Sequence, residues 1–231
     1  MLRCSRTWKG SMSKVAKAPE PLVEGYKIKN KGLLERRQQQ ISEAAMKLFA
    51  QKGYHNTSVR DIARMSNIST GSIYDYVKSK EDILFLVSQK FFATLKEKVE
   101  KTLHGLDDPL MKLKATLEAT LTVIDNFQEY VLITYRESKH FKKQDLIGIF
   151  QQERFFVDLF MKIFKEGNEK GVLRVNDPFL VANFLTMMTH GWALKRYRLK
   201  GYSLFRFKEM LIEFVMQGII EPGTSVQEID T

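Results

Sequence analysis

The feature of this sequence that most constrains its fold is a helical repeat of apolar residues near the N-terminal quarter. Apolar side chains recur there at the i, i+3, i+4, i+7 and i+8 spacing of a single helix face. They are Ile41, Ala44, Ala45, Leu48 and Phe49. Gly53 follows where a helix would end on a left-handed residue. The pattern predicts an amphipathic helix within residues 35–53.

A short capped segment comes next. Thr57 or Ser58 can cap the helix "VRDIARMS", and Asp61 lies three residues after Ser58, which is the capping-box spacing. Asn67 follows where the chain must turn, and asparagine tolerates the left-handed conformation better than most residues. These residues predict a short helix that ends in a tight turn.

A second short helix is predicted over "GSIYDYVK", residues 71–78, with Ser69 or Thr70 as its cap. Ile73 and Val77 lie one turn apart and are expected to face the core. Two short helices joined by a three-to-four-residue turn form a helix-turn-helix. The outward positions would then be Thr70, Gly71, Ser72, Asp75 and Tyr76.

From Ser79 a long helix is predicted to run to about His104–Gly105. Five more helices are expected at roughly 107–126, 128–138, 142–170, 177–199 and 203–219. With 44% hydrophobic residues and 16 phenylalanines among 231 residues, the chain can bury a sizeable core. The expected fold class is all-α, with an N-terminal three-helix helix-turn-helix domain and a larger helical domain.

Composition divides the chain into four parts. Residues 1–30 are expected to form a disordered basic arm, 31–84 the helix-turn-helix domain, 85–221 the larger helical domain and 222–231 a flexible tail. Residues 1–40 hold ten basic and three acidic residues, a net charge of +7 within a total of +10. Such an arm suits a polyanion such as DNA, RNA or an anionic membrane surface, and a solvated tail that keeps the protein in solution is the alternative. Met12 could be the true start of the protein.

Several functional classes find no support in the sequence. The four histidines are dispersed, and the usual motifs of metalloproteases, hydrolases and nucleotide-binding enzymes do not occur. Glu137 and His140 have the Glu-x-x-His spacing of di-iron sites, but only one copy is found. We therefore expect no catalytic residue, no cofactor and no metal.

The expected location is the cytoplasm. Cys4 is the single cysteine, the first residues lack the apolar stretch of a signal peptide, and the longest uncharged run, 178–194, is too short to span a bilayer. No membrane association is therefore expected.

The residues of the second short helix suit close approach to DNA. Short side chains such as Ser72 can donate to phosphates or bases, and Gly71 lets the backbone come near. Asp75 could accept from a cytosine amino group or could pair with Lys78 away from DNA. An ordinary solvated helical corner remains the other interpretation of these residues.

The stretch from Ile41 to Leu84, "ISEAAMKLFAQKGYHNTSVRDIARMSNISTGSIYDYVKSKEDIL", resembles the DNA-binding domain of the TetR family of transcriptional repressors. The resemblance implies binding of double-stranded DNA at a near-palindromic operator. It implies DNA contacts, chiefly to phosphates, from Thr57 or Ser58, Arg60, Ser69, Thr70, Gly71, Ser72, Tyr74, Tyr76 and Lys80. Val77 replaces the usual phenylalanine, and Asp75 with Tyr76 replaces more basic or histidine-containing pairs, so the base preference is open.

The same resemblance implies a homodimer that pairs its last two long helices with those of a second subunit. Those helices, 177–199 and 203–219, carry many apolar positions, including Phe184, Trp192 and Phe214. An intramolecular core is the alternative, because aromatic residues and methionines mark both settings.

The middle helices are rich in phenylalanine, which favours a cavity for a small hydrophobic effector. The candidate ligand-binding residues are Phe91, Phe92, Tyr135, Arg136, Phe155 and Trp192. Arg136 could hold a phosphate or carboxylate, or could pair with a nearby glutamate on the surface.

The layout of the larger domain is similar to the acyl-CoA-responsive, FadR-like branch of the family. The resemblance therefore implies a ligand-responsive regulator, a repressor released from its operator by an apolar effector such as a long-chain acyl-CoA. A regulator that senses a drug or an aromatic compound, for example to control an efflux pump, is the alternative.

Overall fold

The computed structural model of the protein describes residues 31–137, 141 and 143–220. The predicted basic arm, residues 1–30, and the predicted tail, residues 222–231, lie outside the described residues. In the described part of the chain the regular structure is helical, as the sequence predicted, and the elements are α1 to α8 with one 3₁₀ helix, η1. We refer to residues 31–84 as the head and to residues 85–220 as the body.

The head begins with α1, Lys31–Lys52, which starts earlier than the predicted 35 because "KGLL" already brings Leu34 into the core. The five apolar residues that predicted this helix are all buried. Gly53 ends the helix in the left-handed conformation, with φ of 81°, and its N–H donates to the carbonyl of Phe49 at 2.9 Å. The prediction for this helix is confirmed.

The second helix of the head, α2, spans Val59–Met65. Its N-cap is Ser58, and the predicted capping box with Asp61 is present. Asn67 has a φ of 55° and turns the chain, as expected. The short helix and its turn are therefore as the sequence predicted.

The third element of the head is shorter than predicted. An α-helix over 71–78 was expected, but the structure has the 3₁₀ helix η1, Ser72–Asp75, alone. The N–H of Tyr76 bonds to the carbonyl of Ile73, three residues back, and Ser79 already starts the next helix. Because Ser79 must be extended to cap that helix, with φ of −149°, the preceding segment has no room for a further α-helical turn.

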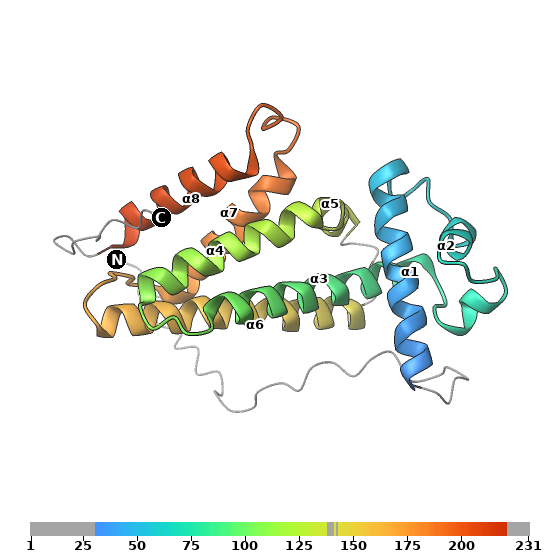
Figure 1. Ribbon diagram of the computed structural model, residues 1–231, viewed down its shortest axis with the longest axis horizontal. Coiled ribbons are helices and arrows are strands. Elements are labelled where there is room, and N and C mark those ends of the chain that lie inside the picture. The colour runs from blue at the N-terminus through green and yellow to red at the C-terminus, as the bar shows by residue number, and fades with distance from the viewer. Residues whose placement is uncertain (1–30, 138–140, 142, 221–231) are drawn as a thin grey trace, which may run out of the picture.

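A long helix, α3, spans Lys80–Leu103 and belongs to both the head and the body. Ser79 caps it through a bond from the N–H of Asp82, and Gly105 follows its end with a φ of 80°. Figure 1 shows α3 leaving the head and running along the length of the body. The head is therefore carried on the end of a body helix.

The rest of the body contains α4 (Pro109–Asn126), α5 (Gln128–Glu137), α6 (Lys143–Glu169), α7 (Pro178–Leu194) and α8 (Leu204–Ile219). These bounds agree with the predicted ones to within two residues, except at the end of α7. That helix stops at Leu194 rather than 199, because the N–H groups of Arg196 and Arg198 bond to carbonyls three residues back in successive tight turns.

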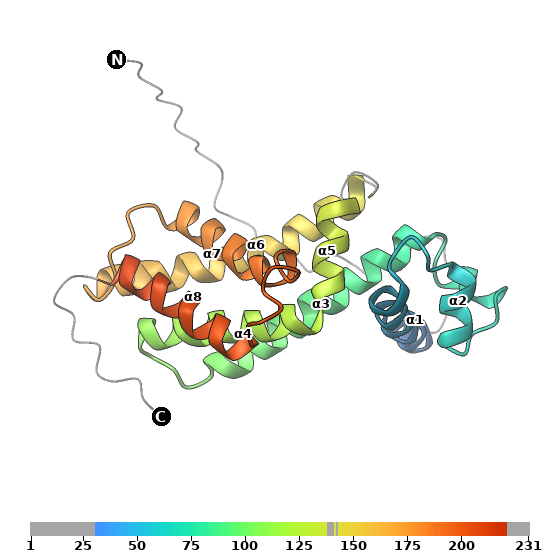
Figure 2. The same cartoon turned by 90° about the horizontal axis from the view of Figure 1, so that it is seen from above.

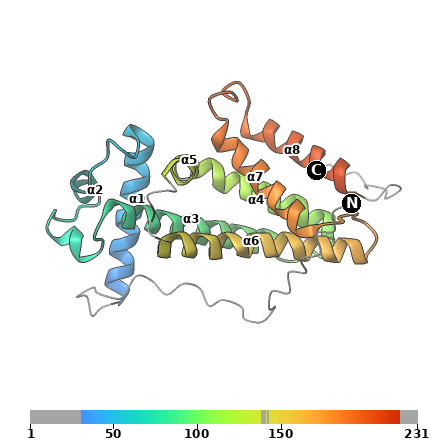
Figure 3. The ribbon, with the colours of Figure 1, turned by 180° about the vertical axis from the view of Figure 1, so that it is seen from behind.

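The body is a bundle in which α3 and α6 lie side by side (Figures 1 and 3), α4 packs against α3, α6, α7 and α8, and α7 also packs directly on α6. Figure 2 shows α8 along one side of the body, next to α4 and far from α1 and α2. Leu173 and Ile220 form an isolated bridge, in which the N–H of Arg174 donates to the carbonyl of Ile219 at 2.7 Å. This contact ties the end of α8 to the α6–α7 loop.

No helix in the described ranges combines the length and the apolar character that crossing a membrane requires.

Candidate DNA-binding surface and body cavity

The segment between α2 and α3 presents short polar residues to solvent. Thr70, Gly71 and Ser72 are exposed, and no atom lies within 4 Å of where a Gly71 side chain would begin. The N-cap position of η1 is Gly71, and not Ser69 or Thr70 as predicted, because the helix begins only at Ser72. The Ser69 hydroxyl oxygen still accepts from the Ser72 N–H at 3.0 Å, and its hydroxyl donates to the Ser72 Oγ at 2.8 Å. The loop is thereby held in one shape, with the Thr70 hydroxyl and the Gly71 backbone at its outer edge.

Two buried side chains anchor this segment from below. Ile73 and Val77 are almost wholly buried, as the sequence predicted. The ring of Tyr74 is 50% exposed, whereas Tyr76 is half-buried against the core, and the Gln38 amide donates to the Tyr76 carbonyl at 3.4 Å. Asp75 is exposed. Tyr76 therefore serves the packing of the head as well as its surface.

The start of α2 separates the two residues that the sequence could not distinguish. Thr57 is 1% exposed and its hydroxyl donates to the Gly53 carbonyl at 2.8 Å, so it closes the α1–α2 corner and its side chain is not at the surface. Ser58 is exposed, and Arg60 is exposed on the first turn of α2. Of the pair Thr57 or Ser58, only Ser58 is placed to meet a ligand.

The pKa of the Asp61 carboxyl lies far below its usual range, because Lys52 at 2.8 Å and the Ser58 hydroxyl and N–H bond to its carboxylate form. Asp61 is therefore an anion that fixes the beginning of α2. It also orients Ser58 beside Arg60.

A polar cluster joins the head to α5 of the body. The ammonium of Lys80 lies 4.1 Å from the centre of the Tyr54 ring and 3.4 Å from the His55 carbonyl. Partial burial lowers the pKa of Lys80, and burial together with the Glu81 and Glu137 carboxylates raises that of Tyr54. His55 Nε2 lies 2.9 Å from Glu137 Oε1, at the end of α5. Lys80 was predicted from sequence to contact a phosphate. In the structure its ammonium already contacts Tyr54 and the His55 carbonyl.

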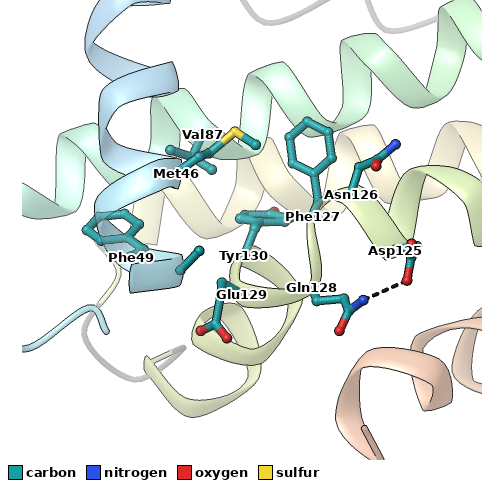
Figure 4. A pocket seen from close by; sticks show the side chains of 10 residues that line it. Met46, Phe49, Val87, Asp125, Asn126, Phe127, Gln128, Glu129 and Tyr130 are labelled. Carbon is teal, nitrogen blue, oxygen red and sulfur yellow. Dashed lines mark hydrogen bonds between the residues drawn. The ribbon is translucent and has the colours of Figure 1, made fainter. Parts of the chain in front are cut away.

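Beside this cluster lies a cavity of about 260 Å³ between α1 and the α4–α5 corner, here called the joint cavity. Figure 4 shows Met46 and Phe49 of α1 on one side and Phe127 and Tyr130 on the other. At its edge the Gln128 amide donates to Asp125 Oδ1 at 2.6 Å, and the same oxygen accepts from the Trp192 Nε1–H at 2.7 Å.

A second cavity of about 330 Å³ lies inside the body and is here called the body cavity. Its apolar wall is mostly aromatic and comes from α3, α5 and α6. This wall comprises Phe91, Phe92, Leu95, Val131, Ile149, Phe150, Phe156 and Phe160. Its polar lining comprises Thr120, Tyr130, Thr134, Tyr135, Glu153, Thr186, Thr189 and His190. Tyr130 lines both cavities, and its ring lies 4.9 Å from that of Phe91.

The polar end of the body cavity has three titratable side chains, Tyr135, Glu153 and His190. Tyr135 Oη lies 3.0 Å from His190 Nδ1, and burial lowers the pKa of His190 from 6.5 to about 4, so the ring is neutral at pH 7. Burial raises the pKa of Glu153, and that carboxylate contributes to the raised pKa of Tyr135. The described residues that line this cavity include no lysine and no arginine.

Three of the six residues proposed from sequence as ligand contacts line this cavity, namely Phe91, Phe92 and Tyr135. Arg136, Phe155 and Trp192 do not. Arg136 is exposed, because it follows Tyr135 and points off another face of α5. Trp192 is 1% exposed, and its Nε1–H donates to Asp125 Oδ1. Phe155 is 41% exposed and meets the cavity only through its neighbour Phe156, whose ring centre is 5.1 Å away.

Apart from Tyr135, sequence reasoning missed the polar residues of the cavity. Glu153 lies four residues after Ile149 and three before Phe156, on the apolar face of α6, and Thr186 and His190 are likewise four residues apart on α7. A polar residue in register with an apolar helix face was the signal that could have identified them. No cluster of three His, Cys, Asp or Glu side chains suited to a metal occurs within 31–137, 141 and 143–220.

The last two helices divide their apolar residues between two faces. Ala182, Leu185, Trp192, Leu211 and Val215 are buried in the body. Large apolar side chains also lie on the outside, with exposed fractions between 46% and 69%, and we call this set the outer apolar face. It comprises Phe179, Leu180, Phe184 and Met187 of α7 with Phe205, Met210 and Phe214 of α8.

Comparison with known proteins supports the interpretation of both parts. Residues 41–87 match the family model of bacterial regulatory proteins of the tetR family, and residues 106–219 match a tetracyclin repressor-like C-terminal domain. The HTH-type transcriptional regulator HbdR of Aromatoleum sp. is 30% identical over 81% of this chain and 80% of its own. A fatty acid metabolism regulator protein of Bacillus subtilis is 21% identical over 78% of this chain and 94% of its own.

Among solved structures, AibR in complex with isovaleryl coenzyme A and operator DNA superposes with a TM-score of 0.65, at 20% identity, over 77% of this chain and 97% of that one. At that identity the superposition establishes the fold alone. The family models and the HbdR relative establish more: this chain is a DNA-binding transcriptional regulator of the TetR family, and not an enzyme.

Proposed function

We propose that the protein is a repressor that binds a near-palindromic operator as a homodimer, in the cytoplasm, and leaves it when a small, largely apolar effector enters the body cavity. The observation that carries this proposal is the position of α5. This helix contributes Tyr130, Thr134 and Tyr135 to the body cavity. Its last residue, Glu137, contacts His55 of the head.

The proposed contact with DNA comes from the exposed part of the head. Ser58, Arg60, Ser69, Thr70, Gly71, Ser72 and Tyr74 are all exposed there. Tyr76 and Lys80 are only partly exposed. We propose that the Tyr76 hydroxyl and the Lys80 ammonium add to this contact. Hydroxyls, a glycine backbone and a guanidinium suit phosphate contacts, with few groups left to read base edges. Two heads of a dimer would engage major grooves about one helical turn, ~34 Å, apart.

The proposed dimer forms through the outer apolar face of α7 and α8. Seven large apolar side chains exposed on two consecutive helices exceed the scattered exposure that is normal for a monomer. A two-fold interface would pair this face with itself, producing a four-helix contact. The proposal reconciles the two interpretations of the sequence, because the opposite faces of the same helices form the intramolecular core.

The proposed route from the effector to DNA passes through α5. Tyr130 lies between the two cavities, and the joint cavity leaves room beside Met46 and Phe49 for α5 to move against α1. An effector that displaces α5 would shift both Tyr130 and the His55–Glu137 contact, and would move the head on α3. A preference of ~1–3 kcal/mol for the released state is sufficient for regulation.

For the effector we propose an acyl-CoA whose acyl group enters the body cavity. A volume of about 330 Å³ is near the lower limit for drug-sized ligands, which favours a short or ring-containing acyl group over a long chain. The solved structure of AibR holds isovaleryl coenzyme A, a short acyl thioester, and is similar in fold. The aromatic wall also suits a free aromatic compound, which is the second candidate.

Operator selection from random DNA with the full chain tests the DNA-binding proposal, and we expect an enriched near-palindrome. Release of that operator is then followed by fluorescence anisotropy during titration with isovaleryl-, benzoyl- and palmitoyl-CoA. We expect the first two to release DNA at lower concentration than palmitoyl-CoA. If no acyl-CoA releases DNA while a free aromatic compound does, the effector class is the second candidate. Without an enriched site, sequence-specific binding is refuted.

A further inference from the structure

The body cavity offers a ligand many hydrogen-bond acceptors and very few donors. Each of its four threonines donates its hydroxyl hydrogen to a backbone carbonyl of its own helix. The acceptors are Thr116 O for Thr120 at 2.7 Å, Tyr130 O for Thr134 at 2.8 Å, Ala182 O for Thr186 at 3.1 Å and Thr186 O for Thr189 at 2.9 Å. A hydroxyl has one hydrogen and two lone pairs, so these oxygens can only accept from a ligand.

The tyrosine hydroxyls of the cavity add few donors. The Tyr130 hydroxyl has one hydrogen, and burial raises its pKa, so it stays protonated. Tyr135 and the neutral His190 share one bond and hold two hydrogens between them. Whichever atom donates, this pair keeps a single free donor.

Glu153 adds a carboxylate to the same wall. It lies among Ile149, Phe156 and Phe160 on α6, and the described lining has no lysine or arginine to neutralise it. Burial raises its pKa, because the ionised carboxylate loses hydration in this wall. A hydroxyl or ammonium donor placed beside it would relieve that cost, whereas a second carboxylate would increase it.

We infer that the body cavity selects an effector whose buried end donates a hydrogen bond, a hydroxyl or an amine on an apolar ring or chain, and rejects one that ends in a free carboxylate. The inference rests on the proposed role of this cavity as the effector site. It refines that role, because a thioester that masks an acid, with a hydroxyl on its acyl group, satisfies the wall whereas the free acid does not.

Isothermal titration calorimetry with three ligands of the same ring system tests this selection on the full chain. The probes are 2-naphthol, which donates, 2-methylnaphthalene, which is neutral without a donor, and 2-naphthoate, which is a carboxylate. We expect 2-naphthol to bind at least ~10-fold more tightly than 2-naphthoate, since a hydrogen bond to a charged group is worth ~1.5–3 kcal/mol. 2-Methylnaphthalene should lie between them.

The variant Glu153→Gln should reduce the difference between 2-naphthol and 2-naphthoate, chiefly by improving the binding of the carboxylate. Asp158→Asn, which removes an exposed carboxylate from the same helix, is the matched control and should keep the wild-type order. Thermal unfolding of each variant reports whether the fold is retained.

Equal affinity of the wild type for all three ligands would overturn donor selection while leaving the cavity as an effector site. An unchanged order in Glu153→Gln would overturn the role given to Glu153. If none of the three binds, the cavity does not take compact apolar molecules, and both the selection and the proposed effector site are refuted.

Discussion

The head and the body distribute their side chains in opposite ways. In the head the large apolar residues, such as Phe49 and Ile73, are buried, and the segment between α2 and α3 exposes small polar residues. In the body the cavity has a polar end that includes Glu153 and His190, while large apolar residues lie on the outer face of α7 and α8. A surface that meets hydrated phosphates needs the first arrangement, and a surface that meets another apolar face needs the second. The difference predicts that substitutions in the body change dimerisation and stability, whereas substitutions on the surface of the head change operator affinity.

The largest expected effect is on the outer apolar face. Phe184→Glu places a charge in the proposed dimer interface, twice per dimer because the proposed contact is two-fold. A buried charge without a partner costs about 3–5 kcal/mol, so we expect a monomer by sedimentation velocity at concentrations where the wild type is dimeric. Operator affinity should fall with it, because the two heads are no longer linked.

Met111→Glu is the matched control for this prediction. Met111 is an exposed methionine on α4, outside the outer apolar face, and the same charge should leave the dimer intact. A dimeric Phe184→Glu variant would place the subunit contact elsewhere and would weaken the contrast between head and body.

The next largest effect concerns pH. His190 has a pKa of about 4 in the folded protein and 6.5 when unfolded, so the unfolded chain binds more protons between these values. Stability from this residue is therefore complete above pH 6.5 and is lost as the pH falls to about 4, by up to about 3 kcal/mol. Urea unfolding should show a shallower pH dependence in His190→Gln than in the wild type over this range.

The exposed His104, at the end of α3, supplies the comparison for that experiment. His104→Gln should keep the wild-type pH dependence. If the two variants behave alike, His190 is not buried in the neutral form and the polar end of the cavity is wetter than the structure indicates.

The two parts of the chain were also unequally predictable from sequence. In the head, Ser58, Asn67, Ser69 and Ser79 each fix a local bond or backbone angle, so caps and turns could be assigned residue by residue. The predicted length of the helix at η1 was wrong, because the start of α3 follows within a few residues and leaves no room for a longer helix. The periodicity of apolar residues does not show this. Local signals of this kind lie within a few residues of each other.

In the body the helices could be predicted but the cavity could not. Its wall joins Phe91, Tyr135, Glu153 and His190 from four helices, and which faces meet depends on packing between distant segments. Aromatic content identified Phe91 and Phe92, whereas it wrongly suggested the buried Trp192 as a cavity residue. Helix content follows from local pattern, and the lining of a cavity follows from tertiary contacts.

A smaller effect is expected on the surface of the head. Arg60→Ala should weaken operator binding about tenfold and reduce the slope of log affinity against log salt by about one, as for the loss of one phosphate contact. Fluorescence anisotropy at several salt concentrations measures both. Lys101→Ala, an exposed cation at the far end of α3, should change neither. Equal slopes in Arg60→Ala and the wild type would remove Arg60 from the DNA-binding surface.

The smallest effect on stability, and the sharpest test of how head and body communicate, is expected at His55. The ring is mostly exposed, so its bond to Glu137 contributes at most about 1 kcal/mol to folding, and His55→Ala should fold and bind the operator almost as the wild type does. The effector should still bind, because His55 does not line the body cavity.

What should change in His55→Ala is the coupling between the two events. Loss of ~1 kcal/mol of coupling would raise the effector concentration needed for half-release of DNA about fivefold, while calorimetry shows unchanged effector binding to the free protein. Gln51→Ala, an exposed residue of α1 near the same corner, is the control. If His55→Ala releases DNA at the same effector concentration as the wild type, the His55–Glu137 contact does not carry the coupling. The movement of α5 would then reach the head through the packing of Tyr130 beside the joint cavity.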